Sequence, residues 1–195
     1  DSSGNYLMSI TGSDTNTSYH NYSNMLPAPK GVAVDNSGNI YVAEANGGFV
    51  QKYSSTGTLL MTMDLNIPGA CCSSPKEVVV DNSGNIYIAH SNNVEKFSSS
   101  GNSLMTWDTQ GSTKGVAVDS SGNVYVANTG SLIQKFGPSG NLILSFGSTG
   151  TGDGEFKSPK RIALDNSGNI YVTDFTNDRV QKFDSSGNHI LSFGS

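Results

Sequence analysis

Charge, arginine and cysteine are all scarce in this chain of 195 residues. Only 14% of the residues are charged, the formal net charge is −5, and the two arginines are Arg161 and Arg179. Because a nucleic-acid-binding surface usually needs clustered basic residues, we expect no nucleic-acid partner. No apolar run reaches the ~20 residues that a helix needs to cross a bilayer, so we expect no membrane span.

The only two cysteines are adjacent, Cys71 and Cys72. A single pair at this spacing provides neither a disulfide framework nor a zinc site. The simplest interpretation is two small thiols in a loop. The alternatives are a vicinal disulfide or an intermolecular bridge, and both would require an oxidising compartment.

Two glycosylation sequons lie in the longest polar segment and indicate an extracellular location. They are Asn16-Thr17-Ser18 and Asn21-Tyr22-Ser23, and a glycan there would meet little steric hindrance. The chain begins without a methionine and has no visible signal peptide, so we expect a processed form or an excerpt of a longer protein. These features favour a secreted or cell-surface protein.

One sequence unit occurs four times and dominates the chain. The last copy, PKRIALDNSGNIYVTDFTNDRVQKFDSSGNHILSF, spans residues 159–193. The lysines that open the units are spaced by 46, 38 and 46 residues: Lys30, Lys76, Lys114 and Lys160. Each copy contains four apolar segments separated by turns or a loop, and a repeat of this length and content is typical of a β-propeller blade.

Within each unit, apolar residues alternate along the first and second segments. This period of two, with many β-branched residues, predicts strands packed between stacked sheets, and no stretch has a helical period. The positions are Val32 and Val34, Val78 and Val80, Val116 and Val118, Ile162 and Leu164 in the first strands, and Ile40 and Val42, Ile86 and Ile88, Val124 and Val126, Ile170 and Val172 in the second.

The sequence therefore predicts an all-β fold, a β-propeller of four-stranded blades that forms a single domain or part of one. The four blades are expected at about 29–64, 75–107, 113–147 and 159–195. Residues 1–10 match only the fourth strand of a blade, and residues 11–28 form a polar connector.

A five-residue turn joins the first two strands of every unit. Its sequence is Asp-Asn-Ser-Gly-Asn or Asp-Ser-Ser-Gly-Asn, in which the aspartate can bond the backbone ahead of it and glycine supplies a positive φ. Calcium takes about six to eight oxygen ligands, usually from several carboxylates, whereas each turn has one aspartate. We interpret the motif as turn chemistry rather than as a calcium site.

The repeated segments GVAVDNSGNIYVAEANGGFVQKY and RIALDNSGNIYVTDFTNDRVQKF, with the connector FGSTGTGDGEFKSPK, resemble NHL repeats. The resemblance covers nearly the whole chain from residue 29 onward. It implies a propeller, commonly of six blades, that is often used for protein binding. Similar propellers also include peptidyl-amidating lyases, streptogramin lyases and RNA-binding proteins.

The chain departs from this family at its N-terminus. The last blade already has its own outer strand, so the segment containing Tyr6, Leu7, Met8 and Ile10 has no blade to complete within the chain. Such a strand is prone to pair with another sheet. Three explanations remain open: an excerpt of a longer propeller, an unusual small closed ring, or donation of the strand to a neighbouring molecule in a ring or filament.

One candidate ligand site would lie at the mouth of the propeller channel. The opening lysines Lys30, Lys76, Lys114 and Lys160 would converge there as an anion site, with the residues that end the second strands: Glu44, His90, Asn128 and Asp174. We favour the structural alternative, in which Glu44 and Asp174 pair with the lysines. A second set of lysines is expected to solvate a blade face and protect its edges: Lys52, Lys96, Lys135 and Lys182.

No catalytic or metal-binding set can be assembled from the sequence, and no cofactor is expected. The three histidines, His20, His90 and His189, occupy unrelated repeat positions, and only His90 is expected near the axis. The interpretation is a non-enzymatic extracellular structural or interaction module, with a protein partner, self-association above all. The alternatives are an excerpt of a larger NHL propeller with metal-dependent lyase activity, or a peptide- or carbohydrate-binding propeller.

Overall fold

The computed structural model describes residues 26, 28–65 and 74–194. These residues form four antiparallel sheets, and in each sheet the four strands follow the order of the chain. Blade 1 contains β1 (Pro29–Val34), β2 (Ile40–Glu44), β3 (Phe49–Tyr53) and β4 (Leu59–Asp64). Blade 2 contains β5 (Pro75–Val80), β6 (Ile86–His90), β7 (Asn93–Phe97) and β8 (Ser103–Asp108).

Blade 3 contains β9 (Thr113–Val118), β10 (Val124–Asn128), β11 (Ile133–Phe136) and β12 (Leu142–Phe146). Blade 4 contains β15 (Pro159–Leu164), β16 (Ile170–Asp174), β17 (Arg179–Phe183) and β18 (His189–Gly194). Between blades 3 and 4 the connector forms a short parallel pair, β13 (Ser148–Thr149) and β14 (Glu155–Phe156). A single turn of 3₁₀-helix, η1 (Phe175–Asn177), follows β16.

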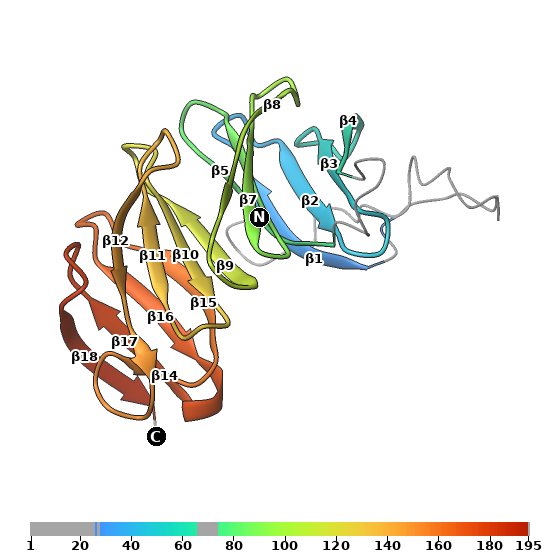
Figure 1. Cartoon of the computed structure of the whole chain (residues 1–195). Coiled ribbons are helices and arrows are strands. Elements are labelled where there is room, and N and C mark those ends of the chain that lie inside the picture. The colour runs from blue at the N-terminus through green and yellow to red at the C-terminus, as the bar shows by residue number, and fades with distance from the viewer. Residues whose placement is uncertain (1–25, 27, 66–73, 195) are drawn as a thin grey trace, which may run out of the picture.

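The four blades stand side by side in an arc (Figure 1). The first strands, β1, β5, β9 and β15, lie next to one another in that order along the inner side, and the fourth strands lie outermost. This arrangement confirms the predicted all-β propeller of four-stranded blades. No helix among the described residues has the length and hydropathy required to traverse a membrane.

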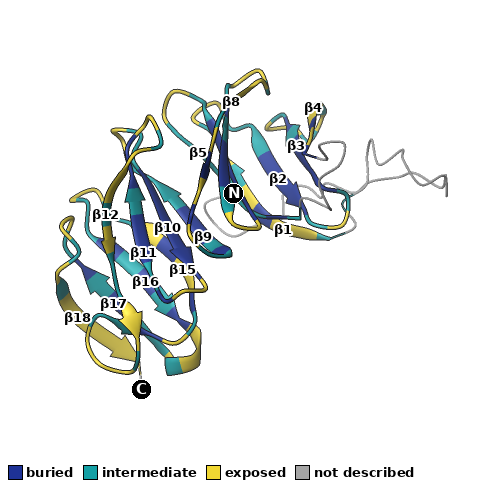
Figure 2. Cartoon of the chain, in the orientation of Figure 1, coloured by how far each residue is buried: buried dark blue, intermediate teal, exposed yellow. Residues whose placement is uncertain are grey.

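The hydrophobic core lies between consecutive blades. Each junction joins the second, third and fourth strands of one blade to the first three strands of the next. Between blades 1 and 2, for example, Tyr41, Ala43 and Val50 pack with Val78 and Ile88. In blades 2 and 3, the second strands β6 and β10 are buried along their whole length because a sheet covers each of their faces, whereas the outer strands β12 and β18 are largely exposed (Figure 2).

The predicted turn chemistry is confirmed. In the first turn, Asp35 Oδ1 accepts hydrogen bonds from the backbone N–H groups of Ser37 and Asn39, both at 2.9 Å, and Gly38 has φ 78°. Asp35 Oδ2 accepts from Asn39 Nδ2 and, at 3.1 Å, from the Tyr41 hydroxyl. The same bonds recur in the other three blades, so each aspartate is used within its own turn.

The second set of lysines has a more specific role than the expected solvation. Each Nζ lies 5.0–5.2 Å from the ring centroid of the tyrosine whose hydroxyl bonds the turn aspartate. A cation over an aromatic face is attracted by the ring quadrupole. Each blade therefore repeats a lysine–tyrosine–aspartate stack, on Lys52, Lys96, Lys135 and Lys182.

Glycine permits the close approach of two pairs of inner strands. A Cβ on Gly115 of β9 would lie 2.6 Å from the Lys160 carbonyl oxygen of β15, and one on Gly31 of β1 would lie 2.8 Å from the Glu77 Cα of β5. The equivalent residues of blades 2 and 4 are Glu77 and Arg161, which form an ion pair. Because β9 lies between their strands, this pair links blades 2 and 4 across the glycine of blade 3.

Candidate functional site

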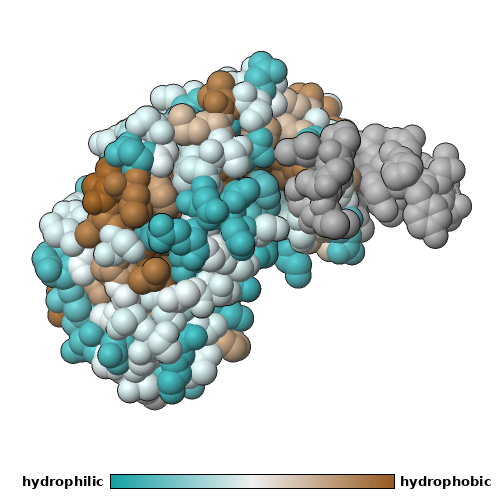
Figure 3. Space-filling view, in the orientation of Figure 1, coloured by the Kyte–Doolittle hydropathy of each residue, from teal (hydrophilic) through white to brown (hydrophobic). Residues whose placement is uncertain are grey.

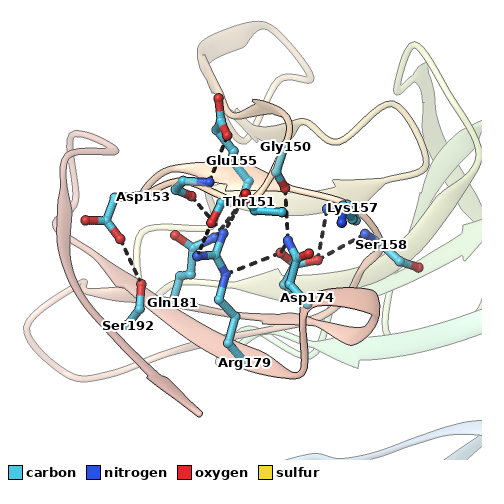
Figure 4. Close-up of polar contacts among 12 residues, drawn as sticks. Gly150, Thr151, Asp153, Glu155, Lys157, Ser158, Asp174, Arg179, Gln181 and Ser192 are labelled. Carbon is cyan, nitrogen blue, oxygen red and sulfur yellow. Dashed lines mark hydrogen bonds and ion pairs between the residues drawn. The ribbon is translucent and has the colours of Figure 1, made fainter. Parts of the chain in front are cut away.

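The residues that end the second strands are buried and bind the connectors. Asp174 Oδ1 accepts hydrogen bonds from the backbone N–H groups of Lys157 and Ser158, both at 3.0 Å, and Oδ2 accepts from Asn177 Nδ2 at 2.6 Å (Figure 4). Its ion pair is with Arg179 Nε at 3.5 Å. The expectation that Asp174 pairs with a channel lysine is therefore wrong. The carboxylate instead binds the backbone at the start of blade 4 and pairs with Arg179.

Glu44 occupies the same position in blade 1. Its Oε2 accepts a hydrogen bond from the Ala28 backbone N–H at 2.9 Å, and Oε1 has no hydrogen-bond partner among the described residues. Burial raises the pKa of Glu44, because a desolvated carboxylate is less stable than the neutral acid. Among the described residues no lysine forms an ion pair with Glu44, so the structural alternative fails here too.

Asn128 has the same function in blade 3. Its Nδ2 donates to the Thr109 carbonyl at 2.9 Å and to Gln134 Oε1 at 3.1 Å, and its Oδ1 accepts from the Gly130 backbone N–H. An amide is suited to this site because it can donate and accept at once. The blade therefore fixes its connector without a buried charge.

Blade 2 differs, because His90 faces an acid. His90 Nε2 lies 3.5 Å from Glu95 Oε2, and Glu95 Oε1 accepts a hydrogen bond from the Ser103 hydroxyl at 2.7 Å. Burial alone would raise the pKa of Glu95, but the interaction with His90 and the Ser103 hydrogen bond outweigh it and lower the pKa. This pair is the one chemically distinct feature of the four sites.

The third strands contribute a buried polar partner that the sequence reasoning missed. In blades 1, 3 and 4 it is glutamine, and in blade 2 it is glutamate: Gln51, Gln134, Gln181 and Glu95. In blade 4 its Nε2 donates to the Glu155 carbonyl at 2.7 Å and its Oε1 accepts from the Gly154 N–H at 2.9 Å. The signal was present, since a polar residue precedes the lysine in every third strand.

The connector between blades 3 and 4 is fixed to blade 4. Arg179 donates to the carbonyl oxygens of Thr151, Gly152 and Glu155 at 2.7–2.8 Å, as Figure 4 shows. Together with the bonds to Asp174 described above, these contacts hold residues 150–158 against β16 and β17. A connector is thus positioned by the blade that follows it.

The opening lysines do not act as one ring of equivalent cations. Lys76 Nζ donates to Ser112 Oγ at 2.7 Å and to the Thr113 carbonyl at 3.2 Å. Burial lowers the pKa of Lys76, and the nearby charge of Lys114 lowers it further. Lys160 Nζ instead lies 3.9 Å from the Phe175 ring centroid. Of the predicted cations, the structure brings together Lys76 and Lys114, while Lys30 is exposed.

The inner strands enclose a cleft of about 440 Å³. Its lining is mostly aliphatic and comes from all four blades, from Val32, Val80, Val118 and Ile162 among others, with Glu77 and Arg161 as the charged pair. Among the described residues, no group of three or more histidine, cysteine, aspartate or glutamate side chains is arranged to hold a metal ion. The lining favours apolar contact over acid–base chemistry.

The first strand of blade 1 exposes a face that is buried in the other blades. Val32 is 64% exposed and Val34 is 62% exposed. At the position of Val32, the other three blades have Val78 at 0%, Val116 at 4% and Ile162 at 8%, each covered by the preceding blade. Among the described residues, no preceding blade covers this apolar face of blade 1, which we call the leading face.

Blade 4 exposes the complementary face at the other end of the arc. Phe193 of β18 is 50% exposed, whereas the equivalent Met63 and Trp107 are 5% and 8% exposed under the following blade. Leu191, on the same side of the strand, is also exposed. We call this side of blade 4 the trailing face.

The outer strands carry further exposed aliphatic residues, one at the same position in each blade: Leu60, Leu104, Ile143 and Ile190. On the face drawn in Figure 3 such residues form separate brown patches, over β8 and β12, divided by hydrophilic surface. Scattered apolar residues of this kind are ordinary on a protein surface. They do not combine into one binding site.

Several predicted residues lie outside the described part of the chain. They are the assembly strand Tyr6, Leu7, Met8 and Ile10, the glycosylation candidates Asn16 and Asn21, and the cysteines Cys71 and Cys72. Each of the four described sheets has its own fourth strand, so none of them needs a donated strand to reach four.

Comparison with known proteins identifies the class of protein first. The protein is a β-propeller of four-stranded blades, and the solved structures that resemble it are far larger. A virginiamycin B lyase from Staphylococcus aureus superposes with a TM-score of 0.72 at 13% identity, over 89% of this chain and 57% of its own. A streptogramin B lyase superposes with a TM-score of 0.71 at 14% identity, over 86% of this chain and 54% of its own.

Kuenenia stuttgartiensis hydrazine synthase gives a TM-score of 0.71 at 14% identity, over 87% of this chain and 50% of its own. The chain therefore spans about half the length of these structures, and at such identities the likeness establishes the fold alone. Residues 26–53 and 156–183 match the NHL repeat family model, so the propeller carries NHL repeats in its first and last blades, and the predicted family resemblance is confirmed. No curated protein sequence matched the chain.

Proposed function

We propose that this protein is a non-enzymatic, extracellular interaction module that associates with further copies of itself, head to tail, into a ring or a filament. One observation carries the proposal: the leading face of blade 1 and the trailing face of blade 4 expose residues that are buried wherever two blades meet inside the chain. Covering a valine or phenylalanine side chain contributes about 1.5–3 kcal/mol, so the two faces favour association.

The geometry favours an ordered, head-to-tail mode. The two faces are different surfaces at opposite ends of the arc, so contact between them is heterologous and propagates from copy to copy. Whether the product closes depends on the angle between successive copies. Contact between the two faces would give the protein a role in assembly, and such a role needs no catalytic group and no cofactor.

Particle mass and shape test the proposal directly. Light scattering of the purified chain over a range of concentrations should give masses that rise in multiples of 20.4 kDa, and electron microscopy should show rings or filaments. A single species at 20.4 kDa at every concentration would refute self-association.

The extracellular location is tested separately. Expression through a eukaryotic secretory pathway should yield secreted protein whose mass falls on glycosidase treatment. Asn16→Gln and Asn21→Gln should each remove part of that mass, because each sequon would carry one glycan. Retention of the protein inside the cell would contradict this part of the proposal.

A lyase is the second candidate, because the chain superposes on a virginiamycin B lyase and carries the buried His90–Glu95 pair. Mass spectrometry of virginiamycin B incubated with the protein, with and without divalent cations, separates the two functions. The interaction module leaves the compound intact. Loss of the compound, abolished by His90→Ala, would establish the enzyme instead.

A further inference from the structure

Inside the chain, one aromatic side chain locks blade 4 onto blade 3. Phe156, at the end of the connector, is fully buried and packs with Ile133 of blade 3 and Phe183 of blade 4, whose ring centroid is 5.8 Å away. A Cβ on Gly147 would lie 2.9 Å from the Phe156 ring. Glycine at this position, with φ 102°, therefore leaves room for the Phe156 ring.

The trailing face of blade 4 repeats this receptor. Val180, Phe193 and Gly194 are the counterparts of Ile133, Phe146 and Gly147, and Gly194 again has a positive φ, 119°. They line a pocket of about 370 Å³ together with Asp174, Phe175, Asp178 and Arg179. We call this pocket the socket. Its apolar wall, Val180 and Phe193, is the counterpart of the wall that Phe156 contacts, and the charged side chains of Asp174, Asp178 and Arg179 lie around it.

We call Phe156 a plug, the side chain before a blade that fills the receptor on the preceding blade. The chain carries a second residue of this kind before blade 1. Leu26-Pro27-Ala28-Pro29-Lys30 aligns with Phe156-Lys157-Ser158-Pro159-Lys160, which places Leu26 at the position of Phe156. The register is supported by the structure, because the Ala28 N–H donates to Glu44 as the Ser158 N–H donates to Asp174. Leu26 therefore stands before blade 1 as Phe156 stands before blade 4.

We infer that the socket on blade 4 receives Leu26 of a second copy of this chain, with Val32 and Val34 of that copy covering Leu191 and Phe193. The inference rests on the proposed self-association and specifies the surfaces that make it. A second copy is the occupant because one chain carries both halves of the junction. Within one chain, β5 and β9 separate β1 from β15, and blades 1 and 4 lie at opposite ends of the arc (Figure 1).

The interface between two copies would use the same residue positions as the junctions between blades within the chain. Val32 and Val34 correspond to Ile162 and Leu164, which pack in the same cluster as Phe156. The Phe156 plug is held by its own blade through Arg179 and Asp174, and the Ala28–Glu44 bond provides the matching anchor at blade 1. Both sides of the contact are thus held by the sheets that present them.

Charged substitutions on each face test the inference. Phe193→Asp on the trailing face and Val32→Asp on the leading face should each weaken self-association at least about 100-fold in sedimentation or light scattering, because each buries an unpaired carboxylate. Both side chains are at least half exposed in the single chain, so the fold should survive. Circular dichroism and thermal melting verify that.

Two matched controls carry the same charge elsewhere. Ile190 lies on β18 beside Leu191 but points to the opposite side of the sheet, and Leu104 occupies the equivalent position in blade 2. They are 48% and 54% exposed, close to Phe193. Ile190→Asp and Leu104→Asp should assemble as the parent chain does. Assembly that is lost equally in the controls would overturn the inference.

Mixing the two variants tests direction. Each variant alone should be monomeric, but a mixture should form a 1:1 dimer and nothing larger, since the Val32→Asp chain keeps its socket and the Phe193→Asp chain keeps its plug. Leu26→Ala should weaken association about 10- to 30-fold, and Leu26→Phe should bind at least as tightly as the parent chain.

The outcomes also separate this inference from the proposed function. If the parent chain assembles but Val32→Asp and Phe193→Asp leave assembly unchanged, self-association stands and the socket is wrong. A mixture that gives no dimer likewise overturns the head-to-tail contact. If the parent chain itself stays monomeric, the proposed function fails first.

Discussion

The junction between blades 2 and 3 and the free face of blade 4 share one repeat pattern in opposite environments. Trp107 of β8 is buried under blade 3, against Tyr87 and Phe136, while Phe193 of β18 occupies the same repeat position and is half exposed. The side chains have similar chemistry, so burial by the neighbouring blade, not the residue type, makes one of them part of the core. Terminal repeats of a repeat protein need a polar outer face for solubility, and the leading and trailing faces of blades 1 and 4 are apolar instead.

The first prediction breaks this comparison most sharply. Trp107→Ala should lower the free energy of unfolding by about 3–5 kcal/mol, because it opens a cavity at an internal junction. Phe193→Ala should change the stability of the isolated chain by about 1 kcal/mol or less, since half of the ring is already in contact with water. Urea unfolding at a concentration where the chain is monomeric measures both. Equal losses would show that the trailing face is no different from a junction.

The second prediction concerns the inner strands. Gly115→Ala should cost about 2–3 kcal/mol, because its Cβ would lie 2.6 Å from the Lys160 carbonyl and force β9 away from β15. The matched control is Arg161→Ala, at the same repeat position on blade 4, beside which the described residues contain no inner strand of a following blade. It should cost about 1 kcal/mol or less, the value of an exposed ion pair with Glu77. A harmless Gly115→Ala would contradict the close packing of these strands.

Most of the fold could be predicted from the sequence because the same strand and turn pattern recurs in all four units. The alternation of valine and isoleucine defined the strands, and the aspartate–glycine turns defined the hairpins. The roles of Glu44 and Asp174 could not be predicted, since they depend on which backbone N–H groups the connectors bring near. The lysine–tyrosine stacks were likewise missed, because cross-strand neighbours such as Lys52 and Tyr41 become adjacent only through the register of the sheet.

The end faces illustrate the same limit. Val32 and Val78 look identical in sequence, and a pattern of apolar residues cannot show which copy lacks a neighbour. The expectation that the strand at Tyr6 to Ile10 pairs with another molecule concerns residues outside the described part of the chain and stays a prediction. Only the exposure of the two terminal faces and the socket beside Phe193 indicate where a partner would dock.

The third prediction compares blade 2 with the others. Glu95→Gln gives blade 2 the glutamine that the other three blades carry. Because the folded-state pKa of Glu95 is lowered, its ionised form contributes stability above the ordinary value of 4.5, and this is lost as the pH falls through the folded pKa. The free energy of unfolding of the variant should therefore fall less than that of the parent chain as the pH is lowered from neutral to acid. Identical pH profiles would show that the His90–Glu95 pair contributes nothing.

The smallest expected effects come from the turn aspartates. Asp119 lies near Tyr87 of the preceding blade, at an internal junction, whereas Asp165 lies on blade 4. Burial acts against the ionised form of Asp119, but hydrogen bonds from Asn123, Ser121 and Tyr125 outweigh it and lower its pKa. Asp119→Asn should therefore reduce the unfolding free energy at pH 7 by about 1 kcal/mol or less.

For Asp165, the hydrogen bond from the Asn169 side chain is the main cause of a lowered pKa. Both aspartates contribute stability above their ordinary pKa of 3.8 and lose it as the pH falls through the lower folded values. Replacing either with asparagine should therefore flatten the loss of stability below pH 4 in urea titrations, and Asp119→Asn should do so more, because Asp119 also lies near Tyr87 of the preceding blade. If Asp165→Asn has the larger effect, the difference between internal junctions and the end blade does not extend to the turns.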